Sequence, residues 1–150
     1  MRIICMLALG YAWMLWGSFY LIENTGTLSL IVKNVEAEQG SLYIAIYQDE
    51  SAFLKEGQDL VNKIVPVSSK PNCTIPIPQL PFGSYAIAIF HDLNDNGKLD
   101  KNALGIPTEP YAFSNNPSVK WRSPTFAETL IKFGESRKEI VMELKRWRKH

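Results

Sequence analysis

The stretch from Asp92 to Asp100 carries side-chain oxygens at alternate positions, and this spacing suits the binding of a hard cation. Ca²⁺ takes six to eight oxygen ligands at about 2.3–2.6 Å, and a short loop of this pattern turns several oxygens inward. Gly97 falls at the sharp turn of an EF-hand-like loop. The spacing predicts a calcium site with five ligands: Asp92, Asn94, Asn96, Lys98 and Asp100. Lys98 would contribute its backbone carbonyl, and the other four would contribute side-chain oxygens.

The predicted site is low in charge. The twelfth loop position, where an EF-hand places a bidentate glutamate, falls on Ala103. Asp92 and Asp100 supply the formal charge, and Asn102 or Glu109 is a candidate to complete the shell. Such a site is expected to bind Ca²⁺ weakly, with a Kd of about 10⁻⁴–10⁻³ M, as extracellular modules do. The alternative is an Asx-rich turn that binds no metal, because Asn, Asp and Gly favour turns for backbone reasons.

The N-terminal residues 1–23 are expected to direct export. No charged residue occurs from Ile3 through Ile22, behind the single basic residue Arg2. An apolar run of about 20 residues is long enough to cross a bilayer, so the segment is predicted to be a signal peptide or an uncleaved N-terminal membrane anchor. The rest of the chain is then periplasmic, in the outer envelope or secreted.

The remaining chain suits one domain, residues 24–145, followed by a basic tail, residues 146–150. Sixteen basic and fifteen acidic residues nearly balance, so the charge nominates no nucleic-acid partner. Cys5 lies in the leader, which leaves Cys73 alone in the domain and allows no disulfide within it. Cys73 is expected to be a small buried side chain. The basic tail offers one alternative function, binding to anionic surfaces.

Short runs of alternating or apolar residues separated by turns predict an antiparallel β-sandwich of about seven strands, of the immunoglobulin-like kind. Pro66, Pro76 and Pro78 place their strands at sheet edges. The last two strands flank residues 134–136 and are predicted to form a hairpin. The expected strands are Thr27–Val35, Ser41–Gln48, Val61–Ser68, Cys73–Ile77, Tyr85–His91, Glu128–Phe133 and Lys138–Lys145.

Two short helical turns are also expected. Ser51 is a suitable N-cap for a turn over Ser51–Glu56, and Ser123 followed by Pro124 is suitable for a turn near residue 125. Between the strands, Lys101–Arg122 shows no strand periodicity. A loop of this length is usually functional, and its aromatic residues argue for order.

Two further groups of residues have chemical potential. His91 could act with Asp92 or Glu109 in a hydrolase. Its position in the strand, on the face of Tyr85, Ile87 and Ile89, favours a packed or loop-supporting histidine over that alternative. A set of aromatic side chains either lines a groove for sugar rings or peptide or covers the open end of the sandwich. These are Tyr111, Phe113, Trp121 and Phe126.

Three segments together resemble a family of small exported bacterial proteins known as domain of unknown function family 2141. They are residues 91–100, residues 105–116 and the tetrapeptide Ser123-Pro124-Thr125-Phe126. This resemblance implies an extracytoplasmic β-rich domain without an assigned activity. The shorter segment Leu80–Ile87 is similar to the L-P-x-G-x-Y segment of transthyretin-like and collagen-adhesin B-type sandwich domains.

Taken together, these features predict an exported binding or structural module without catalysis. A weak Ca²⁺ site would order the Lys101–Arg122 segment. The ordered segment would face an envelope or extracellular protein or a polysaccharide, with membrane attachment possible through residues 1–23.

Overall fold

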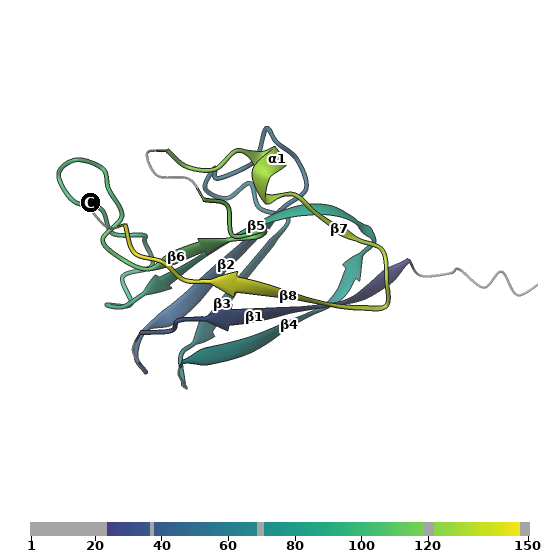
Figure 1. The fold of residues 1–150 in the computed structure, drawn as a ribbon, viewed down its shortest axis with the longest axis horizontal. Helices are drawn as coiled ribbons and strands as arrows, with labels where there is room; N and C mark the ends of the chain where they lie inside the picture. Colours follow the sequence, from purple (N-terminus) through teal and green to yellow (C-terminus); the bar gives the residue numbers. More distant parts are fainter. Residues whose placement is uncertain (1–23, 37, 69–70, 119–121, 148–150) are drawn as a thin grey trace, which may run out of the picture.

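The computed structural model describes residues 24–36, 38–68, 71–118 and 122–147, which form two β-sheets packed against each other (Figure 1). The β-sandwich prediction is therefore confirmed. The expected signal peptide or anchor, residues 1–23, lies outside the described residues. Among the residues that are described, no helix has the length and hydropathy needed to span a bilayer.

The two sheets have different sizes and share no strand. The smaller sheet has the order β4 (Asn72–Pro81), β1 (Thr25–Lys33) and β8 (Arg137–Glu143). The larger sheet contains β3 (Val61–Pro66), β2 (Ser41–Tyr47), β5 (Gly83–Asp92) and β6 (Tyr111–Phe113) in that order, with β7 (Ile131–Phe133) also paired to β5.

The core lies between the sheets and follows from the alternation of apolar residues along the strands. In β1, Leu28, Leu30 and Val32 are fully buried, as the period-2 pattern predicts. Burying each of these side chains stabilises the fold by about 1.5–3 kcal/mol. The opposite sheet contributes buried side chains from β2 and β5, among them Leu42, Ile44, Ile46, Tyr85, Ile87 and Ile89.

The pairing of the last two strands differs from the sequence prediction. The predicted hairpin of the last two strands is wrong, because β7 pairs with β5 while β8 pairs with β1. The β1–β8 pair is also parallel, so the sandwich is not antiparallel throughout. The physical reason is that β8 turns Met142, which is fully buried, into the core beside β1.

The prolines mark sheet edges as expected. Pro66 lies in β3 and Pro76 and Pro78 in β4, and these strands are the outer members of their sheets. Between these two edges the sandwich has an open pocket of about 370 Å³, and Lys63, which lines it, donates from Nζ to the carbonyl of Pro76 at 2.7 Å.

The opposite side of the sandwich is closed by hydrogen bonds. Tyr111 in β6 and Lys145 after β8 exchange two backbone hydrogen bonds of 3.0 and 2.9 Å. Asn116 donates to the carbonyl of Val141 at 2.8 Å and accepts from the N–H of Glu143 at 2.8 Å. β6 itself was not predicted, since three residues are too few to show a strand period.

The helical turns are partly as expected. α1 (Phe126–Thr129) is the single helical turn predicted near residue 125, but its N-cap is Thr125 rather than Ser123. Ser51–Glu56 forms successive turns instead of a helix. Leu54 explains this, because its φ of 58° lies in the left-handed region and ends any right-handed helix there.

Candidate metal centre

Asp92 is the first residue of the predicted site and the last residue of β5, with no exposed surface. Its Oδ1 accepts a hydrogen bond from the N–H of Asn96 at 3.2 Å, and its Oδ2 accepts from the N–H of Gly97 at 2.7 Å. Gly97 has a φ of 79°, which glycine adopts without strain. The carboxylate therefore folds the chain back on the end of its own strand.

The side chains of Asn94 and Asn96 meet at Asp100. Their amide groups donate to the two oxygens of the Asp100 carboxylate, at 2.8 and 3.0 Å. The Oδ1 of Asn94 accepts from the N–H of Asn96 at 3.2 Å, the same N–H that Asp92 binds. The loop thus brings together the side chains of Asn94, Asn96 and Asp100, and Asp92 is linked to them through the N–H of Asn96. The fifth nominated residue, Lys98, donates its N–H to the Oδ1 of Asn96 at 2.9 Å.

Glu109 ties the two ends of the loop together. This carboxylate is 4% exposed, and its Oε1 accepts from the N–H of Leu93 at 2.8 Å. Its Oε2 accepts from the N–H of Asp100 at 3.0 Å. Each oxygen of Glu109 accepts a backbone N–H group, and through these two hydrogen bonds the carboxylate braces the loop.

Asn102 is the other residue considered for the shell, and it organises the next turn instead. Its Oδ1 accepts from the N–H of Leu104 at 2.9 Å and of Ile106 at 3.1 Å. The turn that results presents Leu104 with 76% of its surface exposed. The segment after the loop is thus held by its own side-chain contacts.

Contacts from distant parts of the chain support the loop. The carbonyl of Gln39 lies 2.8 Å from the Nε2 of His91, and Ser41 Oγ donates to Asp95 at 2.9 Å. Gly40 packs so closely that a Cβ there would lie 2.0 Å from the carbonyl oxygen of Asp92. The connection between β1 and β2 is therefore fitted against the base of the loop.

His91 is fully buried on the face of the strand that the sequence predicted for a packed histidine. Its Nδ1 has no hydrogen-bond partner in the part of the chain that the structure describes. The pocket between β3 and β4 is lined by other residues. The imidazole of His91 itself has no exposed surface in this structure.

The described part of the C-terminal basic cluster is partly neutralised. Arg146 forms an ion pair with Glu36 at 2.6 Å and donates to the carbonyl of Thr108 at 2.6 Å. It thereby holds the chain next to Glu109. Residues 148–150 of the tail lie outside the described residues. The contacts of Arg146 favour a structural role over binding to an anionic surface.

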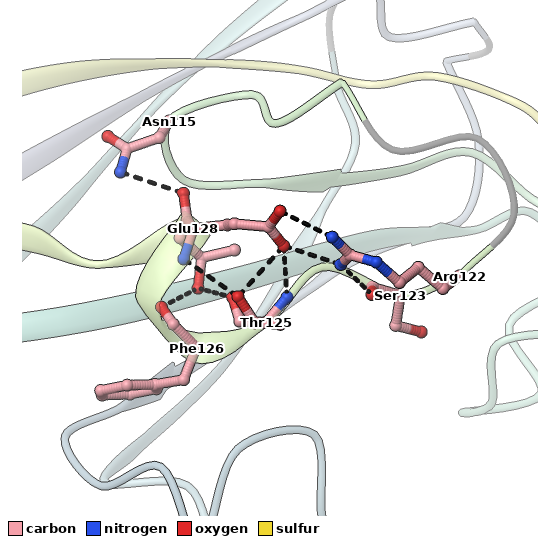
Figure 2. A network of polar contacts seen from close by, with 7 residues as sticks. Asn115, Arg122, Ser123, Thr125, Phe126 and Glu128 are labelled. Carbon is pink, nitrogen blue, oxygen red and sulfur yellow. Dashed lines mark hydrogen bonds and ion pairs between the residues drawn. The ribbon is translucent and has the colours of Figure 1, made fainter.

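A second turn organised by a carboxylate lies at α1 (Figure 2). Glu128 accepts from the N–H of Thr125 at 2.7 Å, and Thr125 Oγ1 accepts from the N–H of Glu128 at 3.3 Å, which completes a capping box. Arg122 binds both oxygens of Glu128 at 2.7 Å. These hydrogen bonds hold the pKa of Glu128 at about 2, with that from Arg122 contributing most. The Thr-x-x-Glu spacing is the sequence signal for this cap, and it was missed.

The chemistry of the donors fits Ca²⁺ better than a transition metal. Among the described residues, no three His, Cys, Asp or Glu side chains gather at one point. The loop offers two carboxylates, two amides and backbone carbonyls, which are the oxygen ligands that Ca²⁺ prefers. Cys73 is half-buried in β4, where burial raises the pKa of its thiol and makes it a poorer nucleophile.

The aromatic residues nominated from the sequence lie partly in one cluster. Phe113 and Phe126 both contact Phe53, with ring centroids 6.5 and 5.7 Å apart, and Tyr111 contacts Phe113 at 5.9 Å. Trp121 lies outside the described residues.

Comparison with known proteins gives a family but no relative of known function. No curated protein and no solved structure matches the chain, so the similarity to transthyretin-like domains is not confirmed. The model of a family described as uncharacterised proteins conserved in bacteria, DUF2141, matches residues 31–141. This match covers both sheets and the whole Asp92–Asp100 loop, and the chain belongs to that family.

Proposed function

We propose that this protein is an exported β-sandwich binding module whose Asp92–Asp100 loop holds Ca²⁺. The observation that carries the proposal is that Asn94 and Asn96 both reach the carboxylate of Asp100, while Asp92 closes the same turn. Three of the nominated side chains therefore lie in contact, and this supports the proposal.

The chemistry of the loop supports a weak site. Two carboxylates provide the formal charge, and the amides of Asn94 and Asn96 now donate N–H groups toward Asp100. To bind a cation next to Asp100, the amide oxygens of Asn94 and Asn96 must take the place of their NH₂ groups. Binding therefore breaks two hydrogen bonds and forms metal–oxygen contacts instead. This cost and the low charge favour a Kd near 10⁻³ M, which is useful only where Ca²⁺ is abundant, outside the cytoplasm.

The role of the metal would be to fix the segment that follows the loop. The backbone carbonyl of Asp100 accepts a hydrogen bond from the N–H of Thr108 at 2.8 Å. The N–H of Asp100 donates to the carboxylate of Glu109. A metal at Asp100 would therefore hold both the loop and the exposed turn after it. The fixed surface would face an envelope or extracellular protein or a polysaccharide, with residues 1–23 acting as signal peptide or anchor.

Calcium titration tests this proposal. With a Kd of about 1 mM, 10 mM CaCl₂ stabilises the folded protein by about 1.4 kcal/mol. This corresponds to a rise in Tm of about 3–6 °C for a domain of this size. Asp100→Asn, which keeps the shape of the side chain, should abolish the rise. Trypsin cleavage after the exposed Lys98 and Lys101 should slow in Ca²⁺ and recover with chelator.

Asp95→Asn is the matched control, since Asp95 lies in the same loop but binds Ser41 rather than Asp100. It should retain nearly the full rise in Tm. An unchanged Tm in the wild-type protein, or an equal rise in the Asp100 variant, would contradict the proposal.

A further inference from the structure

The outer face of the five-stranded sheet carries aromatic rings where an exposed sheet face ordinarily carries polar side chains. Strand register aligns one row across β3, β2, β5 and β6: Ile64, Tyr43, Phe90 and Tyr111. The next row along the same face is Asn62, Ala45, Ala88 and Phe113. We call these eight residues the outer aromatic face.

The smaller sheet provides a comparison within the same molecule. On its outer face, Ser29 stands between Pro76 and Glu139, and Lys33 stands between Asn72 and Glu143. Between these two rows Ile31 stands between Thr74 and Val141, so this face mixes polar and aliphatic side chains, and these rows carry no aromatic ring. The rings are therefore a property of one face of the sandwich and not of the composition of the chain.

Other parts of the chain frame the outer aromatic face and limit its size. At one end Phe53 packs edge-on against Tyr47 at 5.5 Å and against Phe126 at 5.7 Å, over the ends of β2 and β5. At the other end lies the Asp92–Asp100 loop, where a Cβ on Gly97 would be 3.6 Å from the hydroxyl of Tyr43. The rows between these two ends remain partly exposed, with Ile64 at 53%.

The rings on this face are held in place by each other. Tyr43 and Phe90 stack with centroids 4.9 Å apart and planes 13° from parallel. Tyr111 contacts Phe113 edge-on at 5.9 Å. Because these side chains are ordered before any ligand arrives, a ligand that contacts them does not have to immobilise them.

The size of the face favours a small ligand over a protein. Strands lie about 4.8 Å apart and rows on one face about 7 Å apart, so two rows across four strands cover on the order of 250 Å². A stable protein–protein interface buries about 800 Å² on each partner. A second copy of this chain would need two or three times the apolar area that the outer aromatic face provides.

The polar groups of the face indicate which small ligand fits. None of the eight residues is charged, which favours a neutral ligand. Within the described residues, the hydroxyls of Tyr43 and Tyr111 and the amide of Asn62 make no hydrogen bond. Aromatic surface next to unused hydroxyl and amide groups matches a sugar ring, which presents C–H bonds on its face and hydroxyls at its edge.

We propose that the outer aromatic face binds a neutral glycan. Successive sugar rings of the glycan contact Tyr43, Phe90 and Tyr111 at the ring edges and at the ring faces that the Tyr43–Phe90 stack leaves uncovered. Hydroxyls of different sugar rings bond to the two tyrosine hydroxyls and to Asn62, which lies three strands away from Tyr111. This inference specifies the partner class of the proposed function, but it requires no metal, because none of the eight residues is a nominated calcium ligand.

Affinity electrophoresis in gels containing soluble polysaccharides tests the proposal. The probes are hydroxyethyl cellulose, xylan, laminarin and galactomannan, each used with Ca²⁺ and with chelator. At least one should retard the wild-type protein under both conditions. The double variant Tyr43→Ala/Tyr111→Ala should raise the Kd for that polymer at least tenfold. Tyr43→Phe, which removes only the hydroxyl, should raise it by about three- to tenfold.

Val141→Ala is the matched control, since Val141 is 39% exposed on the outer face of the other sheet and should bind as the wild type does. Melting curves of all variants separate loss of binding from loss of fold, and Tyr43→Phe keeps the test valid if the double variant does not fold. No retardation by any of the four polymers, or equal retardation of Tyr43→Phe and the wild type, would overturn the proposal. Dimerisation that is abolished by Ala88→Glu would assign the face to a second copy instead.

Discussion

Glu109 and Glu128 are both carboxylates that accept hydrogen bonds from the backbone, yet they organise the chain in different ways. Glu109 is 4% exposed and binds N–H groups nine and sixteen residues away. The side chain of Glu128 is 36% exposed and binds an N–H three residues away, with Arg122 as its ion-pair partner. One joins the two ends of a loop, and the other caps a single helical turn.

The comparison shows that burial and chain separation, more than the number of bonds, set the importance of a carboxylate. Water can form the hydrogen bonds that Glu128 makes with its exposed partners, so removing Glu128 lowers the free energy of unfolding only a little. The hydrogen bonds from Leu93 and Asp100 to the buried Glu109 are partly buried, so water replaces them less readily, and an unbonded buried N–H costs about 1–3 kcal/mol. Counting hydrogen bonds would wrongly rank Glu128, which also binds Arg122, above Glu109.

The largest effect is expected for Glu109→Ala. This change leaves the N–H groups of Leu93 and Asp100 without their acceptor and should lower the free energy of unfolding by about 3 kcal/mol. Urea denaturation followed by circular dichroism measures it. Glu109→Gln keeps one oxygen and should lose about half as much. A loss below about 1 kcal/mol for the alanine variant would contradict the bracing role.

An intermediate effect is expected for Thr125→Ala. The hydroxyl of Thr125 accepts from the N–H of Glu128 and is part of the capping box of α1. Its removal should lower the free energy of unfolding by about 1 kcal/mol. Thermal melting provides the measurement, and Ser123→Ala serves as control because Ser123 is not the N-cap. A larger effect at Ser123 than at Thr125 would show that the cap is misassigned.

The smallest effect, and one that depends on pH, is expected for Glu128→Gln. The pKa of Glu128 falls from its ordinary 4.5 to about 2 because Arg122 and Thr125 bind the charged form. Folding is therefore stabilised by this group above pH 4.5, and the stabilisation is lost as the pH falls through about 2.

The Tm of the wild-type protein should exceed that of Glu128→Gln slightly at pH 7, and the two should coincide near pH 2. Salt at 1 M should also narrow the gap, since the Arg122 pair is exposed to solvent. A gap that widens as the pH falls would exclude the ion pair as its cause.

Local patterns in the sequence predicted most of the sandwich. The alternation of Leu28, Leu30 and Val32 predicted the buried face of β1, and the apolar run before Asp92 predicted β5 and the place of the loop. The prolines predicted the edge strands. These features depend on the period of the side chains and on the missing proline N–H, both of which act over a few residues.

The remaining features depend on contacts between distant residues, which local patterns do not encode. Nothing near β8 indicates that it pairs with β1 in parallel, and nothing near Glu109 indicates that it binds Leu93. The residues from Asp92 to Asp100 lie close together because they belong to one short loop, and their role as calcium ligands stays a prediction. The bracing contacts of Gln39, Ser41 and Arg146 could not be found in this way.

The parallel β1–β8 pair has a consequence for how the chain acquires its structure. β1 is the central strand of its sheet and one of the earliest segments of the domain, whereas one of its two neighbours is the last strand, residues 137–143. A nascent chain therefore carries an open hydrogen-bonding edge on β1 until nearly the whole domain has emerged. Folding must be slow relative to a helical protein of this size, and truncation before residue 137 should leave a strand edge that promotes aggregation.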